Sequence, residues 1–261
     1  EEDIELAKKL PYKEMSEYGW VPATQKKEER VIMLRKFFEV VQLTVLSNEK
    51  LIPGIACRRL SMSEKADFAL IAWSQKAKLD ARSVQTAPID LKGLTSNIPA
   101  IRAMTTKDPQ IFCGELVKLL AGCGIAVVFL PHIGGSFLHG ATFYDKNKIV
   151  IGLTVRGKDA DKFWFSLFHE IAHILLGHLN QDEGTSEADE AAADAFAKNT
   201  LIPNEAFTRF VSNGQFSKDS ILVFAKAVGI DPGIVVGRLQ KEGFIEFNWH
   251  NDLKTRYQIT A

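Results

Sequence analysis

The stretch from Phe163 to Gly177 constrains the fold of this chain more than any other. Nearly every position up to Leu176 is apolar on all sides of a 3.6-residue repeat, which predicts a helix covered by the rest of the protein. His169, Glu170 and His173 are the ionisable exceptions, in the pattern H-E-x-x-H. Burying such groups without partners would cost about 1–3 kcal/mol for each neutral group and more for a charge. The two histidines are four residues apart and face the same way, so both can bind one metal ion, with Glu170 beside the water that completes the site.

A catalytic zinc site needs a third protein ligand besides the two histidines. The metzincin pattern would place a histidine at position 179, but Leu179 stands there, so this branch is excluded. Glu190 is the favoured third ligand, because Asp194 follows four residues later on the same predicted helix face and can orient a ligand histidine. The alternatives are three acids at the loop or first turn of that helix: Glu183, Glu187 and Asp189.

The same motif predicts a mechanism of peptide hydrolysis. Zinc polarises a carbonyl and activates water, and Glu170 takes the proton of that water and returns it to the leaving amine. His139 is a candidate donor to the developing oxyanion and Tyr144 a weaker one, although both also fit ordinary sheet positions. His178 is expected to be a capping or surface residue.

Composition limits the classes of function. The chain has 32 basic and 32 acidic residues, a balance that argues against strong nonspecific binding to nucleic acid. We find no apolar run long enough for a membrane span and no signal segment, so we expect a cytoplasmic protein with no membrane partner. Its three cysteines are widely spaced and are expected to be reduced thiols. The chain begins Glu-Glu-Asp without methionine, which is compatible with a fragment of a longer protein.

The pattern along the chain predicts an α+β, mainly helical protein. A small zincin-like domain, residues 106–203, is expected to contain a sheet of about three strands beside the H-E-x-x-H helix. Residues 1–105 are expected to form a helical N-terminal region for linking or dimerisation, and residues 204–261 a helical region packed on the core. The predicted strands are 125–130, 138–144 and 148–153, and the predicted helices are about 4–10, 27–45, 61–78, 94–106, 111–120, 163–177, 186–201, 217–228 and 232–241.

Residues 225–239 resemble a helix-turn-helix, with Gly229 at the turn. The presumed second helix offers only Arg238 and Gln240 as residue types that read bases. A packing role is therefore favoured over DNA binding.

Taken together, these motifs resemble the ImmA/IrrE-type metallo-endopeptidases, especially the branch fused to a helix-turn-helix of the repressor or HigA-antitoxin type. The resemblance implies that His169, His173 and Glu190 bind zinc and that Glu170 is the catalytic glutamate. It implies protein substrates such as a repressor, and DNA contact only through a domain not present in this chain. The matching stretches are residues 139–143, 149–157, 163–175, 190–197, 201–203 and 234–240.

Two functions remain open at this stage. The first is a zinc endopeptidase that cleaves one or few partner proteins. The alternative is a non-enzymatic transcription regulator or antitoxin portion, in which the zinc fold senses or binds a partner and the N-terminal helices form a homodimer. Glu170 favours catalysis, because a purely structural zinc site is more usually closed by four protein ligands.

Overall fold

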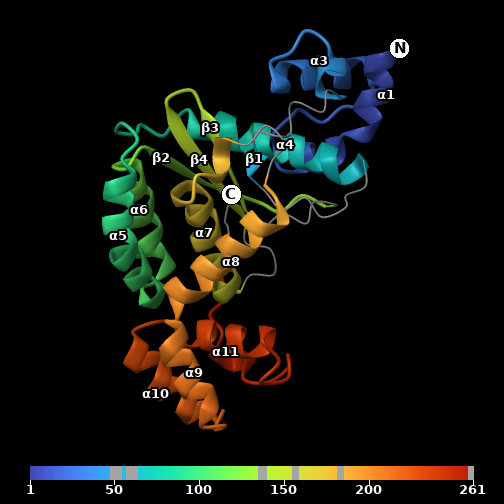
Figure 1. Ribbon diagram of the computed structural model, residues 1–261. Coiled ribbons are helices and arrows are strands. Elements are labelled where there is room, and N and C mark those ends of the chain that lie inside the picture. The colour runs from blue at the N-terminus through green and yellow to red at the C-terminus, as the bar shows by residue number, and fades with distance from the viewer. Residues whose placement is uncertain (48–54, 57–63, 135–139, 155–158, 181–184, 258–261) are drawn as a thin grey trace.

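A mixed sheet with helices on both faces forms the centre of the protein (Figure 1). The computed structural model describes residues 1–47, 55–56, 64–134, 140–154, 159–180 and 185–257. The strand order is β1-β3-β4-β2, with β3 and β4 joined as an antiparallel hairpin and β2 parallel to β4. The strands are β1 (Ile55–Ala56), β2 (Ile125–Leu130), β3 (Gly140–Asp145) and β4 (Lys148–Thr154). The expected α+β, mainly helical class with three main strands is confirmed.

The helices account for most of the described chain. None of those described has the length and apolar character to cross a bilayer alone, and only α10 and α11, bent by 113°, meet these criteria as a pair. The longer helices are α1 (Glu2–Lys9), α2 (Tyr12–Glu17), α3 (Lys27–Phe38), α4 (Glu64–Ala81), α5 (Leu91–Ala103), α6 (Pro109–Ala121), α7 (Ala160–Leu175), α8 (Glu187–Leu201), α9 (Asn204–Ser212), α10 (Lys218–Val228) and α11 (Pro232–Lys241).

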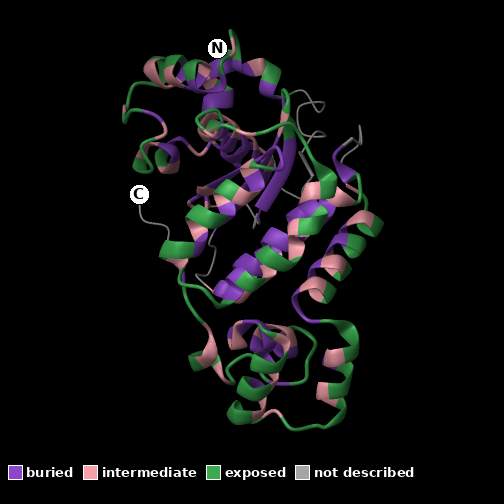
Figure 2. Ribbon diagram, turned by 90° about the vertical axis from the view of Figure 1, so that its left-hand side faces the viewer, coloured by how far each residue is buried: buried purple, intermediate pink, exposed green. Residues whose placement is uncertain are grey.

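Alternate residues of the strands supply two separate cores. Ile125 and Val127 of β2 face a cluster built with α5, α6, α7 and the C-terminal helices. Ala126 and Val128 face the opposite cluster, formed with α1, α3 and α4. Because side chains of a strand alternate between faces, a strand covered on both sides is apolar throughout, as the run at 125–130 predicted. Figure 2 shows the sheet as buried between these two layers. The domain boundaries at 105 and 203 stay a prediction.

Residues 131–134, which follow β2, are bound by side chains of the N-terminal helices. The indole nitrogen of Trp73 on α4 donates to the carbonyl of Pro131 at 3.1 Å, and the ring packs over Gly152, where a Cβ would come within 2.6 Å of it. Tyr18 donates to the carbonyl of His132, and the Gly134 amide donates to Glu14. The N-terminal helices therefore position residues 131–134, which lead toward β3.

Residues 225–239, which resemble a helix-turn-helix, pack inside the protein. Four apolar side chains of α11 are buried, and α11 lies against α7. Arg238 donates to the carbonyl of Ile202 and lies 3.9 Å from the centre of the Phe207 ring. Gln240 is buried and donates to the carbonyls of Phe247 and Trp249. Both candidate base-reading residues are thus used internally, which confirms the packing role.

Helices α2 and α9 and strand β1 were not predicted. Pro11 and Pro203 follow the predicted helices 4–10 and 186–201, and each is the N-cap of a further helix, α2 and α9. Proline is compatible with both roles, because its fixed φ and missing N–H suit the start of a helix as well as its termination. Strand β1 has only two residues, too few for a periodic signal.

Candidate metal centre

Helix α7 places the motif histidines at the boundary of the core. Ten of its other residues are buried, seven of them in the cluster that includes α5 and α6, while the side chain of His169 retains 15% exposure and that of His173 none. The helix ends at Leu175, and Gly177 adopts a positive φ of 77°, which reverses the chain. The chain then passes through a short 3-10 turn, His178–Asn180, and returns along α8 beside α7.

His169, His173 and Glu190 converge on one point. The Nε2 atoms of the two histidines are 3.0 Å apart. Glu190 Oε2 lies 3.3 Å from Nε2 of His169, and its Oε1 lies 3.5 Å from Nε2 of His173. Ligand atoms about 2.0–2.2 Å from a tetrahedral zinc would lie about 3.3–3.6 Å from one another. The two distances to Glu190 fall in this range, and the Nε2–Nε2 distance of 3.0 Å is slightly shorter. These are also the residues that group as a possible metal site in the described part of the chain.

Each histidine has a partner for its outer nitrogen. Asp194 Oδ1 lies 2.9 Å from Nδ1 of His169, in the orienting position expected of it. Nδ1 of His173 lies 2.9 Å from Nδ1 of His178. His178 is only 8% exposed, so the expectation of a capping or surface role is wrong. The reversal at Gly177, which depends on backbone conformation and not on helical spacing, brings His178 back against α7.

The charges of this cluster fit a cation. Burial opposes the charged form of His169, but the hydrogen bond to Asp194 and the nearby carboxylate of Glu190 outweigh burial and raise the pKa of His169 to about 10. Burial likewise favours the neutral acid at Glu190, yet His169 and Thr185 keep the pKa of Glu190 below its usual value. Burial and the neighbouring His169 lower the pKa of His173.

The contacts at the outer nitrogens of the two histidines, and one oxygen of Glu190, also support a metal at this point. If Nδ1 of each ring donates to its outer partner, both Nε2 atoms carry lone pairs that face each other at 3.0 Å. Glu190 Oε2 is buried and has no hydrogen-bond partner among the described residues. A positive charge between these three atoms relieves both problems, so the donor set is suited to a divalent metal such as zinc.

Glu170, the residue after His169 on α7, contacts strand β3. Its side chain is buried, and Thr142 of β3 donates a hydrogen bond to its Oε2 at 2.5 Å. Gly140 lies directly against the carboxylate, since a Cβ there would come within 2.7 Å of Glu170 Oε1. Burial raises the pKa of Glu170 to about 7, the range in which a carboxylate can both accept and release a proton.

Thr142, Gly140, Thr185 and His178 were not identified from the sequence as site residues. Thr185 donates to Glu190 Oε1 at 2.7 Å and so fixes one oxygen of the third candidate ligand. Thr142 and Gly140 come from β3, His178 from the 3-10 turn after α7, and Thr185 from just before the N-cap of α8, and no spacing rule connects them with α7. A threonine or a glycine in a strand is a common residue, and only tertiary contact gives it a role here.

The remaining sequence candidates have different outcomes. Asp189 faces His178 at 3.3 Å and does not belong to the group of possible ligands. Glu187 is exposed in the first turn of α8. Tyr144 is 44% exposed on β3. His139 and Glu183 lie outside the described residues, so their predicted roles stay predictions.

An H-E-x-x-H helix beside a small sheet, with a glutamate from the following helix, defines a zincin-like, metallopeptidase-type fold. Residues 124–239 match the family model Peptidase_M78, described as the IrrE N-terminal-like domain. The match supports an ImmA/IrrE-type domain over these residues, and it does not show the branch with a fused helix-turn-helix. No curated protein matches the chain significantly.

Proposed function

We propose that this chain is a zinc-dependent endopeptidase that cleaves a specific partner protein such as a transcriptional repressor. The observation that carries the proposal is Glu170: a buried carboxylate one residue from a ligand, bonded to Thr142 and not part of the ligand group. A structural metal site has no use for such a group, whereas hydrolysis needs a base beside the ligands. The family match supports a peptidase-like enzyme.

His169, His173 and Glu190 would hold the zinc ion in this proposal. When bound, zinc supplies a Lewis acid that polarises the carbonyl of the scissile bond and makes a water more acidic. Thr142 occupies Oε2 of Glu170, which leaves Oε1 to accept the proton of the attacking water. With a pKa of about 7, Glu170 can then deliver that proton to the leaving amine.

Glu170→Gln is the decisive variant, because it removes the base without changing the shape of the side chain. We expect zinc content of about one per chain in both proteins and a loss of cleavage of at least about 100-fold in the variant. The substrate is found by expressing each form in the same cells and comparing newly created protein N-termini by mass spectrometry. Glu187→Gln, an exposed glutamate of α8, is the matched control and should leave the cleavage products unchanged.

The same comparison tests the non-enzymatic regulator. If wild type and Glu170→Gln retain zinc and produce the same N-termini, the peptidase proposal is wrong. Binding of a partner by both forms would then support sensing or regulation by the zinc fold. The homodimer through the N-terminal helices, the repressor partner and the cytoplasmic location stay predictions.

A further inference from the structure

We propose that His178 and Asp189 together act as positioning residues for the metal ligand His173. They would hold His173 in the one tautomer that presents Nε2 to the metal. This inference rests on the zinc site of the proposed function and assigns a role to two residues outside the ligand set.

The contacts form a buried chain that starts at the ligand. His173 is fully buried, and its Nδ1 lies 2.9 Å from Nδ1 of His178, with the two rings at 63°. On the far side of the second ring, Nε2 of His178 lies 3.3 Å from Oδ1 of Asp189. His178 and Asp189 come from opposite sides of the segment that joins α7 to α8, so the chain of contacts also links the two ligand-bearing helices.

Only one arrangement of protons satisfies this chain when His173 binds a metal. Binding through Nε2 requires a lone pair there, so the proton of His173 must lie on Nδ1. That N–H needs an acceptor, and the atom facing it is Nδ1 of His178. His178 must therefore carry its own proton on Nε2, where Asp189 accepts it. A proton on Nδ1 of His178 would place two N–H groups against each other at 2.9 Å.

Ser186 holds the side chain of Asp189 in place through the carboxylate oxygen that does not face His178. Its Oδ2 accepts hydrogen bonds from the backbone and the hydroxyl of Ser186, at 2.8 and 2.6 Å, as part of the capping box of α8. Its Oδ1 remains directed at His178. The next residue of the helix is Glu190, so one turn of α8 supplies both a candidate ligand and the support of another ligand.

The two ligand histidines are thus supported differently. His169, which is partly exposed, is oriented by one carboxylate, Asp194. His173 is fully buried and is oriented by a second imidazole that a carboxylate orients in turn. Outer partners of this kind typically contribute about 10–100-fold to metal affinity.

Two substitutions of His178 separate positioning from bulk structure. In His178→Asn the side-chain oxygen stands where Nδ1 stood and can accept from His173, whereas His178→Leu fills similar space without an acceptor. Zinc dissociation constants of the full chain are measured by competition with a chromophoric chelator. We expect about 10–100-fold weaker binding for His178→Leu and an affinity close to wild type for His178→Asn. Glu187→Gln is the control for Asp189→Asn, since it removes one acid from the same turn of α8 but leaves the contacts between His173, His178 and Asp189 unchanged.

Imidazole nitrogen NMR of the zinc-loaded chain gives a readout that a purely structural role would not move. Wild type should show His173 protonated at Nδ1 and His178 protonated at Nε2 alone. Equal zinc affinity for His178→Leu and His178→Asn, or a His178 protonated at Nδ1, would overturn the inference while leaving the metal site intact. Wild-type protein that binds no zinc would overturn both this inference and the proposed function.

Discussion

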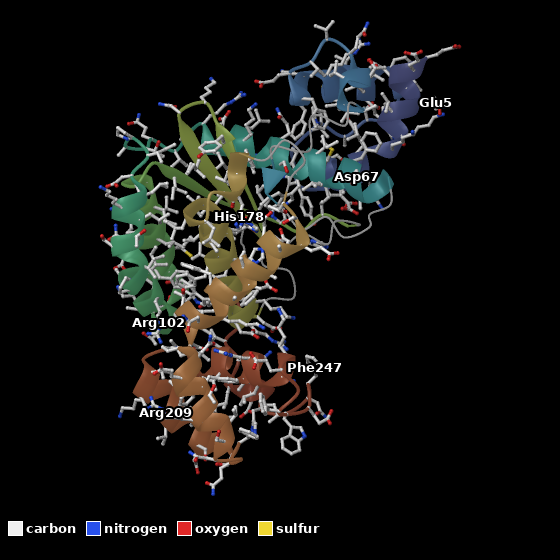
Figure 3. The ribbon with its side chains drawn as sticks, in the orientation of Figure 1. Glu5, Asp67, Arg102, His178, Arg209 and Phe247 are labelled. Atoms are coloured by element: carbon white, nitrogen blue, oxygen red, sulfur yellow. The ribbon has the colours of Figure 1, made fainter. Side chains whose placement is uncertain are left out.

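Both ends of helix α8 make many polar contacts, but the groups that take part differ between the two ends. At the C-terminal end Arg102 donates to the carbonyls of Leu201 and Val228, and Arg238 donates to that of Ile202. At the N-terminal end Glu190 meets the Nε2 atoms of His169 and His173. Figure 3 shows Arg102 and His178 near these opposite ends.

The difference lies in which partner supplies the positive charge. The last carbonyls of a helix carry partial negative charge, and the guanidinium groups neutralise them from within the protein. At the other end the converging atoms are electron-pair donors, two imidazole nitrogens and a carboxylate. The contacts at the C-terminal end are completed by the chain itself and are structural, whereas the donor atoms at the N-terminal end are suited to a cation. The kind of atom that converges at each end therefore separates a candidate metal site from a structural contact better than burial does.

The largest expected effect comes from Glu190→Gln. It keeps the shape of the third ligand but removes its charge, and zinc affinity should fall at least about 100-fold, because losing even an outer partner costs about 10–100-fold. Elemental analysis after dialysis measures this directly. Zinc at 1,000 times its wild-type dissociation constant would stabilise the wild type by about 4 kcal/mol and a variant of 100-fold weaker affinity by only about 1.4 kcal/mol, so adding a chelator should lower the melting temperature of the wild type much more than that of the variant. An equal response of both would mean that Glu190 is not a ligand.

Gly140→Ala should affect catalysis without affecting zinc. The added Cβ would come within 2.7 Å of Glu170 Oε1, so the base or strand β3 must move. Displacing a catalytic group by about 1 Å can lower the rate about 100-fold. The variant should retain one zinc per chain and show a reduced kcat for the cleavage identified with Glu170→Gln. Gly114→Ala is the control for the added methyl, because a Cβ at this position of α6 would meet nothing within 4 Å and the backbone there is helical.

The sequence predicted the parts of this centre that depend on helical spacing. His169 and His173 share a helix face by their offset of four, and Glu190 and Asp194 share another by the same rule. The strands at 125–130 and 148–153 followed from apolar runs and a turn. Each of these patterns lies within a short stretch of sequence, so it can be recognised without knowledge of the tertiary structure.

The parts that were missed depend on contacts between distant segments. Thr142 and Glu170 are 28 positions apart, and their contact follows from the packing of α7 on β3. His178 is near the motif, but its direction is set by the positive φ of Gly177. Asp189 was weighed only as a ligand, because acids at a helix start have several uses that look alike in sequence.

Arg102→Met tests the structural end of α8. Its guanidinium group donates hydrogen bonds to backbone carbonyls, and methionine has no donor to replace them. The free energy of unfolding should therefore fall by about 1.5–3 kcal/mol. Denaturant titration measures this change, and the zinc affinity of the folded variant should match that of wild type. Arg209→Met, at an exposed position of α9, is the control and should change stability by less than about 0.5 kcal/mol. A large loss of zinc affinity in Arg102→Met would show that the two ends are not independent.

The smallest effect is expected for Ser186→Ala at the metal end. Loss of this N-cap should lower the free energy of unfolding by about 1 kcal/mol. Asp189 would lose its bond from the hydroxyl but keep the one from the backbone amide of residue 186, so its Oδ1 would still face His178. We therefore expect the zinc dissociation constant to change far less than in His178→Leu, when both are measured by the same chelator competition. If Ser186→Ala weakens zinc binding as much as His178→Leu does, the capping of α8, and not the orientation of His173, governs the affinity of this end of the helix.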